Sequence, residues 1–147
     1  MWGIFMKDPF SIFRTLINTM ESQIQELAKA QGVEHLAGPQ GFTVSYLFEN
    51  RDKEVFIKDI EERLRISKSV ASNLIKRMEK NGFIEVRPSL RDKRYKQIVL
   101  TELGLDKAEK IKVFRSQIQD LIFKDIDKQD LAATHRVFMQ IKSNLEK

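Results

Sequence analysis

One stretch of the chain concentrates side chains that donate hydrogen bonds and carry positive charge. In residues 67–80, apolar side chains recur at helical spacing, and the opposite face has no acidic residue before Glu79. Its donors are Ser67, Lys68, Ser69, Ser72, Asn73, Lys76 and Arg77. Such side chains read base edges in the DNA major groove, where an α-helix fits. The pattern therefore favours a DNA-reading helix.

A second polar cluster lies between two short β-like segments, residues 83–87 and 94–100. Its charged members are Arg91, Asp92, Lys93 and Arg94. Two strands around such a tip predict a hairpin, which Pro88 would end on one side. A basic hairpin can follow the DNA backbone into the minor groove, where arginine is favoured. The order of short helix, turn, helix and hairpin predicts a winged helix-turn-helix.

The charge distribution supports a polyanionic partner. The chain has 147 residues and a net charge of +5, but residues 63–96 hold eleven Lys and Arg against three Asp and Glu. The rest of the chain holds fifteen against eighteen and is slightly acidic. A basic block within a balanced chain is typical of a nucleic-acid-binding surface, although a charge run can also be a solvated face.

Composition excludes several other classes of protein. A chain of 147 residues with 41% hydrophobic side chains has the size of one globular domain. It has no cysteine, which excludes a disulfide scaffold, a thiolate metal site and a thiol redox sensor. It has no glycine-rich phosphate loop or nucleophile motif, so we do not expect an enzyme. No apolar stretch approaches the roughly 18 residues of a membrane span, and we expect a cytoplasmic protein.

The remaining segments predict helices around this centre. Residues 8–32 carry apolar side chains at alternating spacings of three and four, with Asp8-Pro9 as a start and Gly32 as a stop. Residues 39–49 and 56–64 predict two short helices. Within the helix that Ser67 caps, we expect the buried stripe to consist of Val70, Ala71, Leu74, Ile75 and Met78.

Two further helices are predicted after the hairpin. Thr101 and Asp127 are suitable N-cap residues, because their side-chain oxygens can accept a first-turn N–H. The apolar stripes that follow are Leu105, Ala108, Ile111, Phe114, Ile118, Leu121 and Ile122, then Leu131, Phe138, Ile141 and Leu145. The predicted fold class is mainly α with a small β-hairpin wing.

Two motifs in this arrangement resemble the MarR (multiple antibiotic resistance regulator) family. Residues 66–85, Ile-Ser-Lys-Ser-Val-Ala-Ser-Asn through Asn-Gly-Phe-Ile-Glu, are similar to its recognition helix. Residues 92–104 are similar to its wing signature, Asp-x-Arg followed by Leu-Thr-x-x-Gly. The resemblance covers nearly the whole chain and implies a winged helix-turn-helix lobe at 39–101, flanked by dimerisation helices at 8–32 and 102–147.

The resemblance also implies a function and a role for each matching residue. We expect a homodimer that binds a palindromic double-stranded DNA operator, as a repressor that a small-molecule effector releases. Ser67, Lys68, Ser69, Ser72 and Lys76 would face the major groove, and Arg94 would enter the minor groove. Asp92 would orient Arg94 or pair with Arg77. The alternative is a winged-helix protein-interaction module without specific DNA binding.

Two residues depart from the family pattern. Asn73 stands where arginine is frequent, and asparagine pairs with adenine rather than guanine. Arg65 stands where the family usually has glycine, so the turn either holds a strained residue or differs in geometry, and Arg65 could add a phosphate contact.

The sequence offers candidate residues for an effector pocket and for a metal site. Members of the family commonly bind small aromatic anions, and the residues that would line such a space here are Phe13, Leu16, Tyr46 and Phe114. For each of these residues taken singly, core packing is the favoured interpretation. The two histidines, His35 and His135, lack metal-ligand spacing. We expect no metal and no cofactor.

Overall fold

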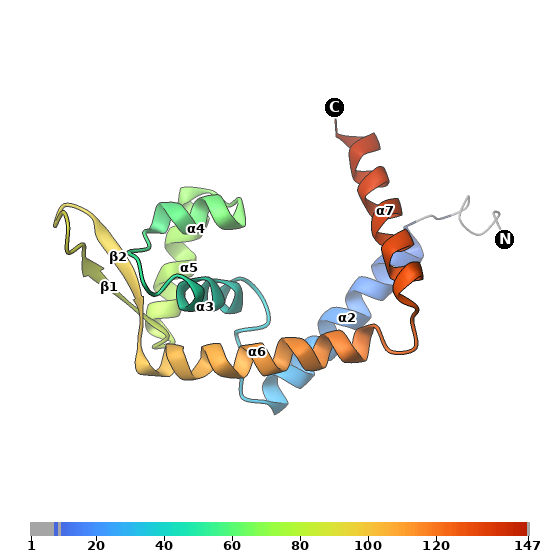
Figure 1. The fold of residues 1–147 in the computed structure, drawn as a ribbon, viewed down its shortest axis with the longest axis horizontal. Coiled ribbons are helices and arrows are strands. Elements are labelled where there is room, and N and C mark those ends of the chain that lie inside the picture. The colour runs from blue at the N-terminus through green and yellow to red at the C-terminus, as the bar shows by residue number, and fades with distance from the viewer. Residues whose placement is uncertain (1–7, 9, 147) are drawn as a thin grey trace. The chain divides into compact units, whose positions relative to one another are not determined.

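The computed structural model describes residues 8 and 10–146 of the chain (Figure 1). The described residues form six helices and one two-stranded antiparallel sheet. In chain order, the elements are α2 (Ser11–Ala30), α3 (Pro39–Glu49), α4 (Ile57–Leu64), α5 (Lys68–Lys80), β1 (Ile84–Pro88), β2 (Lys96–Leu100), α6 (Glu102–Ile122) and α7 (Lys128–Leu145). This confirms the predicted class, mainly helical with a β-hairpin. The chain divides into two compact units, residues 1–115 and 116–147.

The first helix, α2, ends where its sequence predicts. Gly32 adopts a left-handed φ of 72° just beyond the helix. The Val33 amide then donates to the Ala28 carbonyl at 2.8 Å, which pairs one of the carbonyls left free at the helix end. At the other end, the predicted start signal includes Pro9, which lies outside the described residues, while the Asp8 carboxylate accepts from the Phe10 amide at 3.2 Å.

Helices α3, α4 and α5 share one apolar core (Figure 1). The predicted helix at residues 39–49 has the same bounds as α3, and α4 begins at Ile57, one residue later than expected. The Asp59 carboxylate accepts from the Phe56 amide at 2.8 Å and so fixes this start. The core side chains that these helices bury are Val44, Leu47, Ile60, Ala71, Leu74, Ile75 and Met78.

Arg65 makes the turn between α4 and α5 in the left-handed conformation. Its φ and ψ are 54° and 49°, in a region where a side chain costs about 1–2 kcal/mol relative to glycine. The Ile66 amide donates to the Glu61 carbonyl at 3.1 Å, so the strained residue closes the end of α4. The sequence left two options for Arg65, a strained residue in the usual turn or a different turn geometry. The structure shows the first, with arginine in a conformation that glycine favours.

Arg65→Gly is therefore expected to raise the free energy of unfolding. Relief of the left-handed strain outweighs the extra flexibility of glycine in the unfolded chain, which costs about 0.5–1 kcal/mol, so the net gain is about 0.5–1 kcal/mol. Urea unfolding checks this, with Arg65→Ala as the matched control, because alanine removes the same side chain and keeps the strain. Equal stability of the two variants would contradict the assignment of strain.

The hairpin is displaced slightly from its predicted position. Strand β1 runs to Pro88 and β2 begins at Lys96, with Ile84 opposite Leu100 and Pro88 opposite Lys96. Arg94 therefore lies in the tip rather than in a strand, which corrects the predicted strand at 94–100. The reason is local, because the Tyr95 amide donates to the Asp92 carbonyl at 3.0 Å and closes a turn there.

The segment before α4 extends the sheet on its open side. The Ile98 amide donates to the Val55 carbonyl at 2.8 Å, and Phe56 pairs with Gln97 in an isolated antiparallel bridge. The hairpin is thus attached along β2 to the chain that leads into the helix-turn-helix.

Helix α6 begins at the predicted cap, Thr101. Its Oγ1 accepts from the Gly104 amide at 3.0 Å and donates to the Gly82 carbonyl at 2.6 Å. Gly104 is buried so close to the preceding chain that a Cβ placed there would lie 2.1 Å from the Phe83 carbonyl oxygen. The Thr-x-x-Gly sequence thus brings α6 into direct contact with the start of the hairpin.

The second unit contains the last turns of α6 and helix α7. Asp127 caps α7 as predicted, since its carboxylate accepts from the Gln129 amide at 3.1 Å. None of the residues of α7 is buried. Its exposed large apolar side chains are Val137, Phe138, Met139, Ile141 and Leu145. No helix in the described part of the chain is long and apolar enough to cross a membrane.

Candidate nucleic-acid interface

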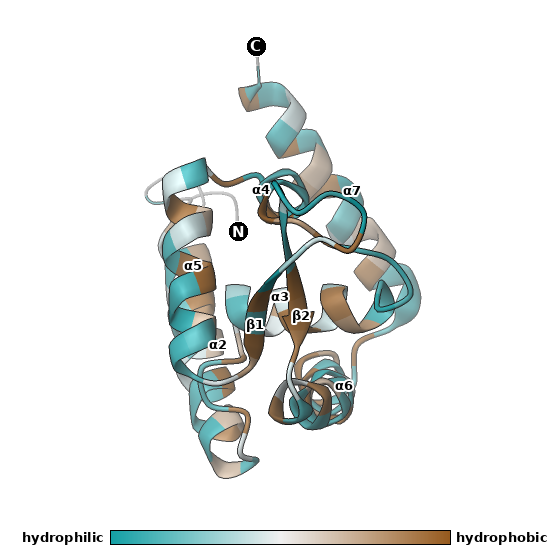
Figure 2. Ribbon diagram, turned by 90° about the vertical axis from the view of Figure 1, so that its left-hand side faces the viewer, coloured by the Kyte–Doolittle hydropathy of each residue, from teal (hydrophilic) through white to brown (hydrophobic). Residues whose placement is uncertain are grey.

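Helix α5 presents its polar face to solvent, as its sequence predicts. Ser67 caps the helix, its Oγ accepting from the Val70 amide at 3.2 Å. The predicted donors Ser67, Lys68, Ser69, Asn73, Lys76 and Arg77 are exposed, and Ser72 is half-buried. In Figure 2 the outward side of α5 is largely hydrophilic, while its inner side is hydrophobic. Because Glu79 lies near the end of the helix, the first three turns form an acid-free surface of donors.

Val70 does not belong to the buried stripe. It is 49% exposed, whereas the other four residues predicted for that stripe, Ala71, Leu74, Ile75 and Met78, are buried. Val70 lies at the edge of the stripe, three residues before the exposed Asn73 and four before the buried Leu74, so helical periodicity alone does not assign it to either face. An apolar side chain therefore stands within the donor surface.

The wing tip holds Arg94 in a defined orientation. The Asp92 carboxylate accepts from the Arg94 backbone amide at 3.1 Å, from Nε at 3.1 Å and from Nη2 at 2.7 Å. Arg94 is still 84% exposed in its side chain, so it is oriented without being buried. Of the two partners predicted for Asp92, the structure has Arg94 and not Arg77.

These contacts shift the acid–base equilibria of both groups. Hydrogen bonds from the Arg94 side chain, and then from its backbone, hold the pKa of Asp92 below its usual value. The same pair raises the pKa of Arg94. The Asp92–Arg94 pair is consequently ionised at neutral pH.

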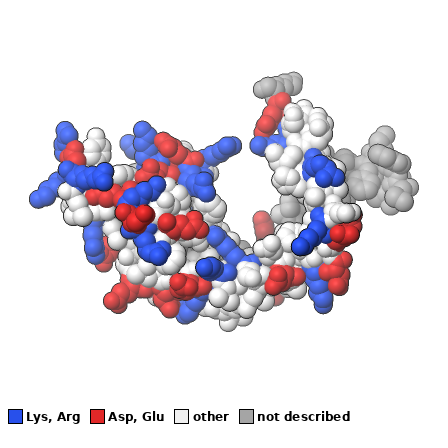
Figure 3. Space-filling view, in the orientation of Figure 1, with Lys and Arg blue, Asp and Glu red and all other residues white. Residues whose placement is uncertain are grey.

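The two other cations of the tip, Arg91 and Lys93, are exposed. Figure 3 shows Lys and Arg side chains projecting from the hairpin tip and from the helices beside it. The predicted wing residues are therefore brought together on one loop.

Two functional candidates at the wing were missed by sequence reasoning. Ser89 is buried, and its Oγ donates to the Glu54 carboxylate at 2.5 Å. The Leu90 amide donates to the other Glu54 oxygen at 2.7 Å. The hydrogen bond from Ser89 is the main cause that lowers the pKa of Glu54. No periodic pattern or cap signal joins residues this far apart, so the sequence held no sign of the contact.

The predicted effector residues occupy different environments. Phe114 is buried, Phe13 and Tyr46 are half-buried, and Leu16 is 51% exposed. The Arg63 guanidinium lies over the Tyr46 ring at 5.8 Å. A pocket of about 570 Å³ is lined by other residues: Gln25, Glu26, Ala28, Lys29, Glu34, His35, Ala37, Gly38 and Pro39.

Neither histidine is part of a metal-ligand cluster in the described part of the chain. His35 is exposed in the loop before α3, with a left-handed φ of 71°, and His135 is exposed on α7. The side chains that α5 and the wing tip expose are mainly hydrogen-bond donors and cations.

Comparison with known proteins identifies the same lobe. The model of the MarR family matches residues 43–94, which run from α3 to the wing tip. The HTH-type transcriptional regulator SarZ of Staphylococcus haemolyticus is 33% identical over 86 residues, 58% of this chain and 55% of SarZ. The repressor IacR of Pseudomonas putida is 25% identical, and the match covers 58% of it. This chain thus spans little more than half the length of these curated relatives.

Solved structures extend the similarity over nearly the whole chain. The heme sensor protein PefR from Streptococcus agalactiae, in complex with heme, is 45% identical over 94% of both chains, with a TM-score of 0.83. The S. aureus MepR–DNA complex shares the fold, with a TM-score of 0.74 over 95% of this chain at 18% identity. The winged helix-turn-helix geometry, the family match at its centre and the near-complete similarity to PefR lead to one conclusion: this chain belongs to the MarR family of winged-helix transcriptional regulators.

Proposed function

We propose that the protein is a homodimeric transcriptional regulator that binds a palindromic double-stranded DNA operator. The observation that carries this proposal is the acid-free donor face of α5 beside a wing whose arginine is already oriented. A major groove accepts such a helix, and its N-terminal residues meet base edges. The basic block of residues 63–96 supplies the phosphate attraction.

Each polar residue of α5 has a role in this proposal. Ser67, Lys68, Ser69, Ser72 and Lys76 face the groove, and Arg77 lies at its edge. Asn73 pairs with adenine, whose N6 and N7 match an amide side chain. Val70, exposed one turn before Asn73, is suited to the thymine methyl group, which is the apolar feature of the groove. The helix therefore favours sites with A·T pairs.

The wing and the turn complete the DNA contacts. Arg94 enters the minor groove, where a weakly hydrated guanidinium is preferred over lysine. Arg91 and Lys93 contact phosphates on either side, and the exposed Arg65 does so from the turn. In this division of roles, the wing adds affinity and register, and α5 adds base recognition.

The terminal helices are the proposed dimer interface. Residues 8–32 and 102–147 provide it, and residues 39–101 form the DNA-binding lobe. In a single chain these segments leave large apolar side chains exposed: Phe10 just before α2, Ile12, Leu16 and Ile17 on α2, and Leu121, Val137, Phe138, Met139, Ile141 and Leu145 in the second unit. Exposed apolar surface on this scale is typical of an association surface. A two-fold dimer would then read a two-fold operator.

As a repressor, the protein would be released by a small-molecule effector. The residues proposed to line that site remain Phe13, Leu16, Tyr46 and Phe114. Heme, which PefR binds, requires an iron ligand and mostly apolar walls. His35 lines the 570 Å³ pocket beside Glu26, Lys29 and Glu34.

Footprinting on DNA selected from a random pool tests this function. The expected result is a protected inverted repeat, with half-site centres about 10 bp apart or a multiple of that. In sedimentation equilibrium, the protein should have a mass of about twice 17.2 kDa. Affinity should fall steeply with salt. A monomer that selects no sequence would instead favour a winged-helix protein-interaction module.

A further inference from the structure

The Glu54 carboxylate connects the chain before α4 to the tip of the wing. Its two oxygens accept from different groups, Oε2 from the Ser89 hydroxyl at 2.5 Å and Oε1 from the Leu90 amide at 2.7 Å. Thirty-five residues separate Glu54 from Ser89. The contact therefore joins the helix-turn-helix side of the lobe to the hairpin, beyond the end of the paired strands.

Ser89 also forms hydrogen bonds to the turn that carries the charged residues. Its side chain is almost fully buried, and its Oγ accepts from the amides of Arg91 at 3.1 Å and Asp92 at 3.2 Å. Its own amide donates to the Tyr95 carbonyl at 2.8 Å. One serine thus fixes both the entry and the exit of the tip, and Glu54 fixes the serine.

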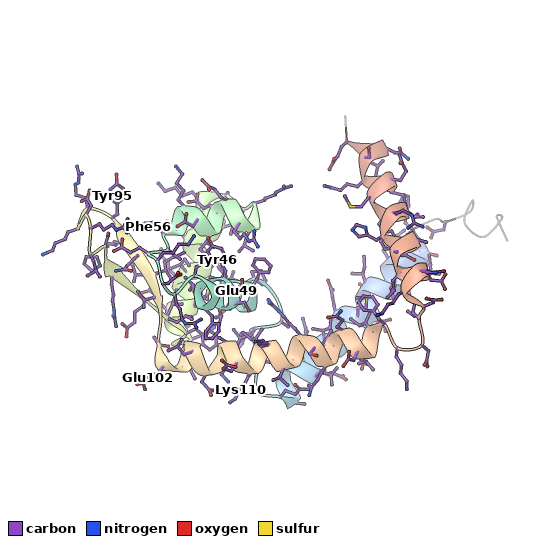
Figure 4. All side chains as sticks on the ribbon, in the orientation of Figure 1. Tyr46, Glu49, Phe56, Tyr95, Glu102 and Lys110 are labelled. Carbon is purple, nitrogen blue, oxygen red and sulfur yellow. The ribbon has the colours of Figure 1, made fainter. Side chains whose placement is uncertain are left out.

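The other side of the tip is supported by an aromatic contact. The rings of Phe56 and Tyr95 pack edge to face, with 6.3 Å between their centroids, and Figure 4 shows both side chains near the hairpin. Phe56 lies two residues after Glu54, so the same short segment supports the tip through a carboxylate and through a ring. The tip that bears Asp92 and Arg94 is therefore attached to the lobe rather than free.

We propose that Glu54 is a positioning residue for DNA binding: through Ser89 it holds the wing tip so that Asp92 presents Arg94 to the minor groove. This inference rests on the proposed function of the wing. A negative charge beside a basic hairpin opposes attraction to DNA by simple electrostatics. Loss of Glu54 makes the protein more positive, so electrostatics predicts tighter binding and positioning predicts weaker binding.

The operator affinity of the Glu54→Ala variant shows whether loss of the carboxylate weakens or strengthens DNA binding. A charge-assisted hydrogen-bond pair that orders the loop corresponds to an affinity loss of about tenfold. Asp52→Ala is the matched control, because Asp52 is an exposed carboxylate of the same loop and makes no described bond to the wing. It should bind as well as the unmodified protein or slightly better. Ser89→Ala should weaken binding without any change of charge.

Two further measurements separate positioning from general destabilisation. The Leu90 amide has Glu54 as its hydrogen-bond acceptor, so its hydrogen exchange in the free protein should accelerate in Glu54→Ala and not in Asp52→Ala. In the double variant Glu54→Ala/Arg94→Ala, the loss should be close to that of Arg94→Ala alone, because both changes remove the same contact.

The outcomes distinguish failure of this inference from failure of the proposed function. If Arg94→Ala weakens binding but Glu54→Ala matches Asp52→Ala, the positioning role is refuted and the wing contact stands. If Glu54→Ala and Arg94→Ala are fully additive, Glu54 acts elsewhere and the inference is equally refuted. If Arg94→Ala itself has no effect, the wing does not bind DNA, and the proposed function of the wing is overturned with the inference.

Discussion

Gly104→Ala is expected to lower the free energy of unfolding by about 2–4 kcal/mol, a large part of the total for one domain. The added methyl group would lie 2.1 Å from the Phe83 carbonyl oxygen and 2.9 Å from Leu100 Cδ2. The carbonyl is backbone and accepts from the Thr101 amide at 3.1 Å, so it cannot move aside without breaking that bond. The better helix propensity of alanine, about 1 kcal/mol, only partly offsets the overlap.

Urea unfolding of Gly104→Ala and Gly38→Ala measures this effect. Gly38 is the matched control, because a methyl group there meets no atom within 4 Å. The free energy of unfolding of Gly38→Ala should differ from that of the unmodified protein by less than about 1 kcal/mol. The Gly104 variant should also lose DNA affinity at temperatures where it is partly unfolded. A Gly104→Ala protein as stable as the control would mean that α6 does not approach the hairpin this closely.

Arg94→Ala is expected to weaken operator binding by about 10–100-fold. The substitution removes a positive charge near the DNA phosphates and a guanidinium group from the minor groove. Each contact of this kind contributes about 1–3 kcal/mol to the binding free energy. Arg94→Lys should recover little of the loss, because an ammonium group gives up its water less readily than a guanidinium. Titration of both variants against one operator at two salt concentrations provides the measurement.

Lys93→Ala is the matched control for Arg94, since it removes an exposed neighbouring cation. It should reduce the salt slope by about one unit and leave sequence preference unchanged. Asp92→Ala should weaken binding although it adds net positive charge, because it frees Arg94 from its partner. Tighter binding by Asp92→Ala, with Arg94→Lys equal to the unmodified protein, would falsify the ordered wing.

The ranking of the wing variants by operator affinity should be the same across about pH 6–8. The folded-state pKa of Asp92 is lowered, so the contribution of its pair is present above the ordinary carboxylate range and is lost as pH falls through the lowered value. The pair is therefore intact throughout the proposed measurements.

Most of the secondary structure of this protein follows from its local sequence. Ser67, Thr101 and Asp127 cap the helices that they were expected to cap, and residues 39–49 form a helix with the predicted bounds. These features depend on bonds between residues two to four positions apart. Such bonds form wherever the local sequence allows, so their partners can be found by reading along the chain.

The donor face of α5 and the basic tip of the wing were also apparent from the sequence. Both are surface features, and a polar side chain opposite an apolar stripe is exposed in almost any packing arrangement. Val70 is the exception, because it lies at the edge of the stripe. There the packing of neighbouring elements, and not the periodicity, decides between core and surface.

The contact that holds the wing, and the need for glycine at position 104, follow from tertiary packing alone. Glu54 and Ser89 meet across 35 residues, and Gly104 excludes a side chain because the Phe83 carbonyl, 21 positions earlier, occupies the space. Contacts at such separations leave no period or spacing in the sequence. They arise once the core has brought distant segments together, so the orientation of Arg94 follows from packing that a linear pattern does not encode.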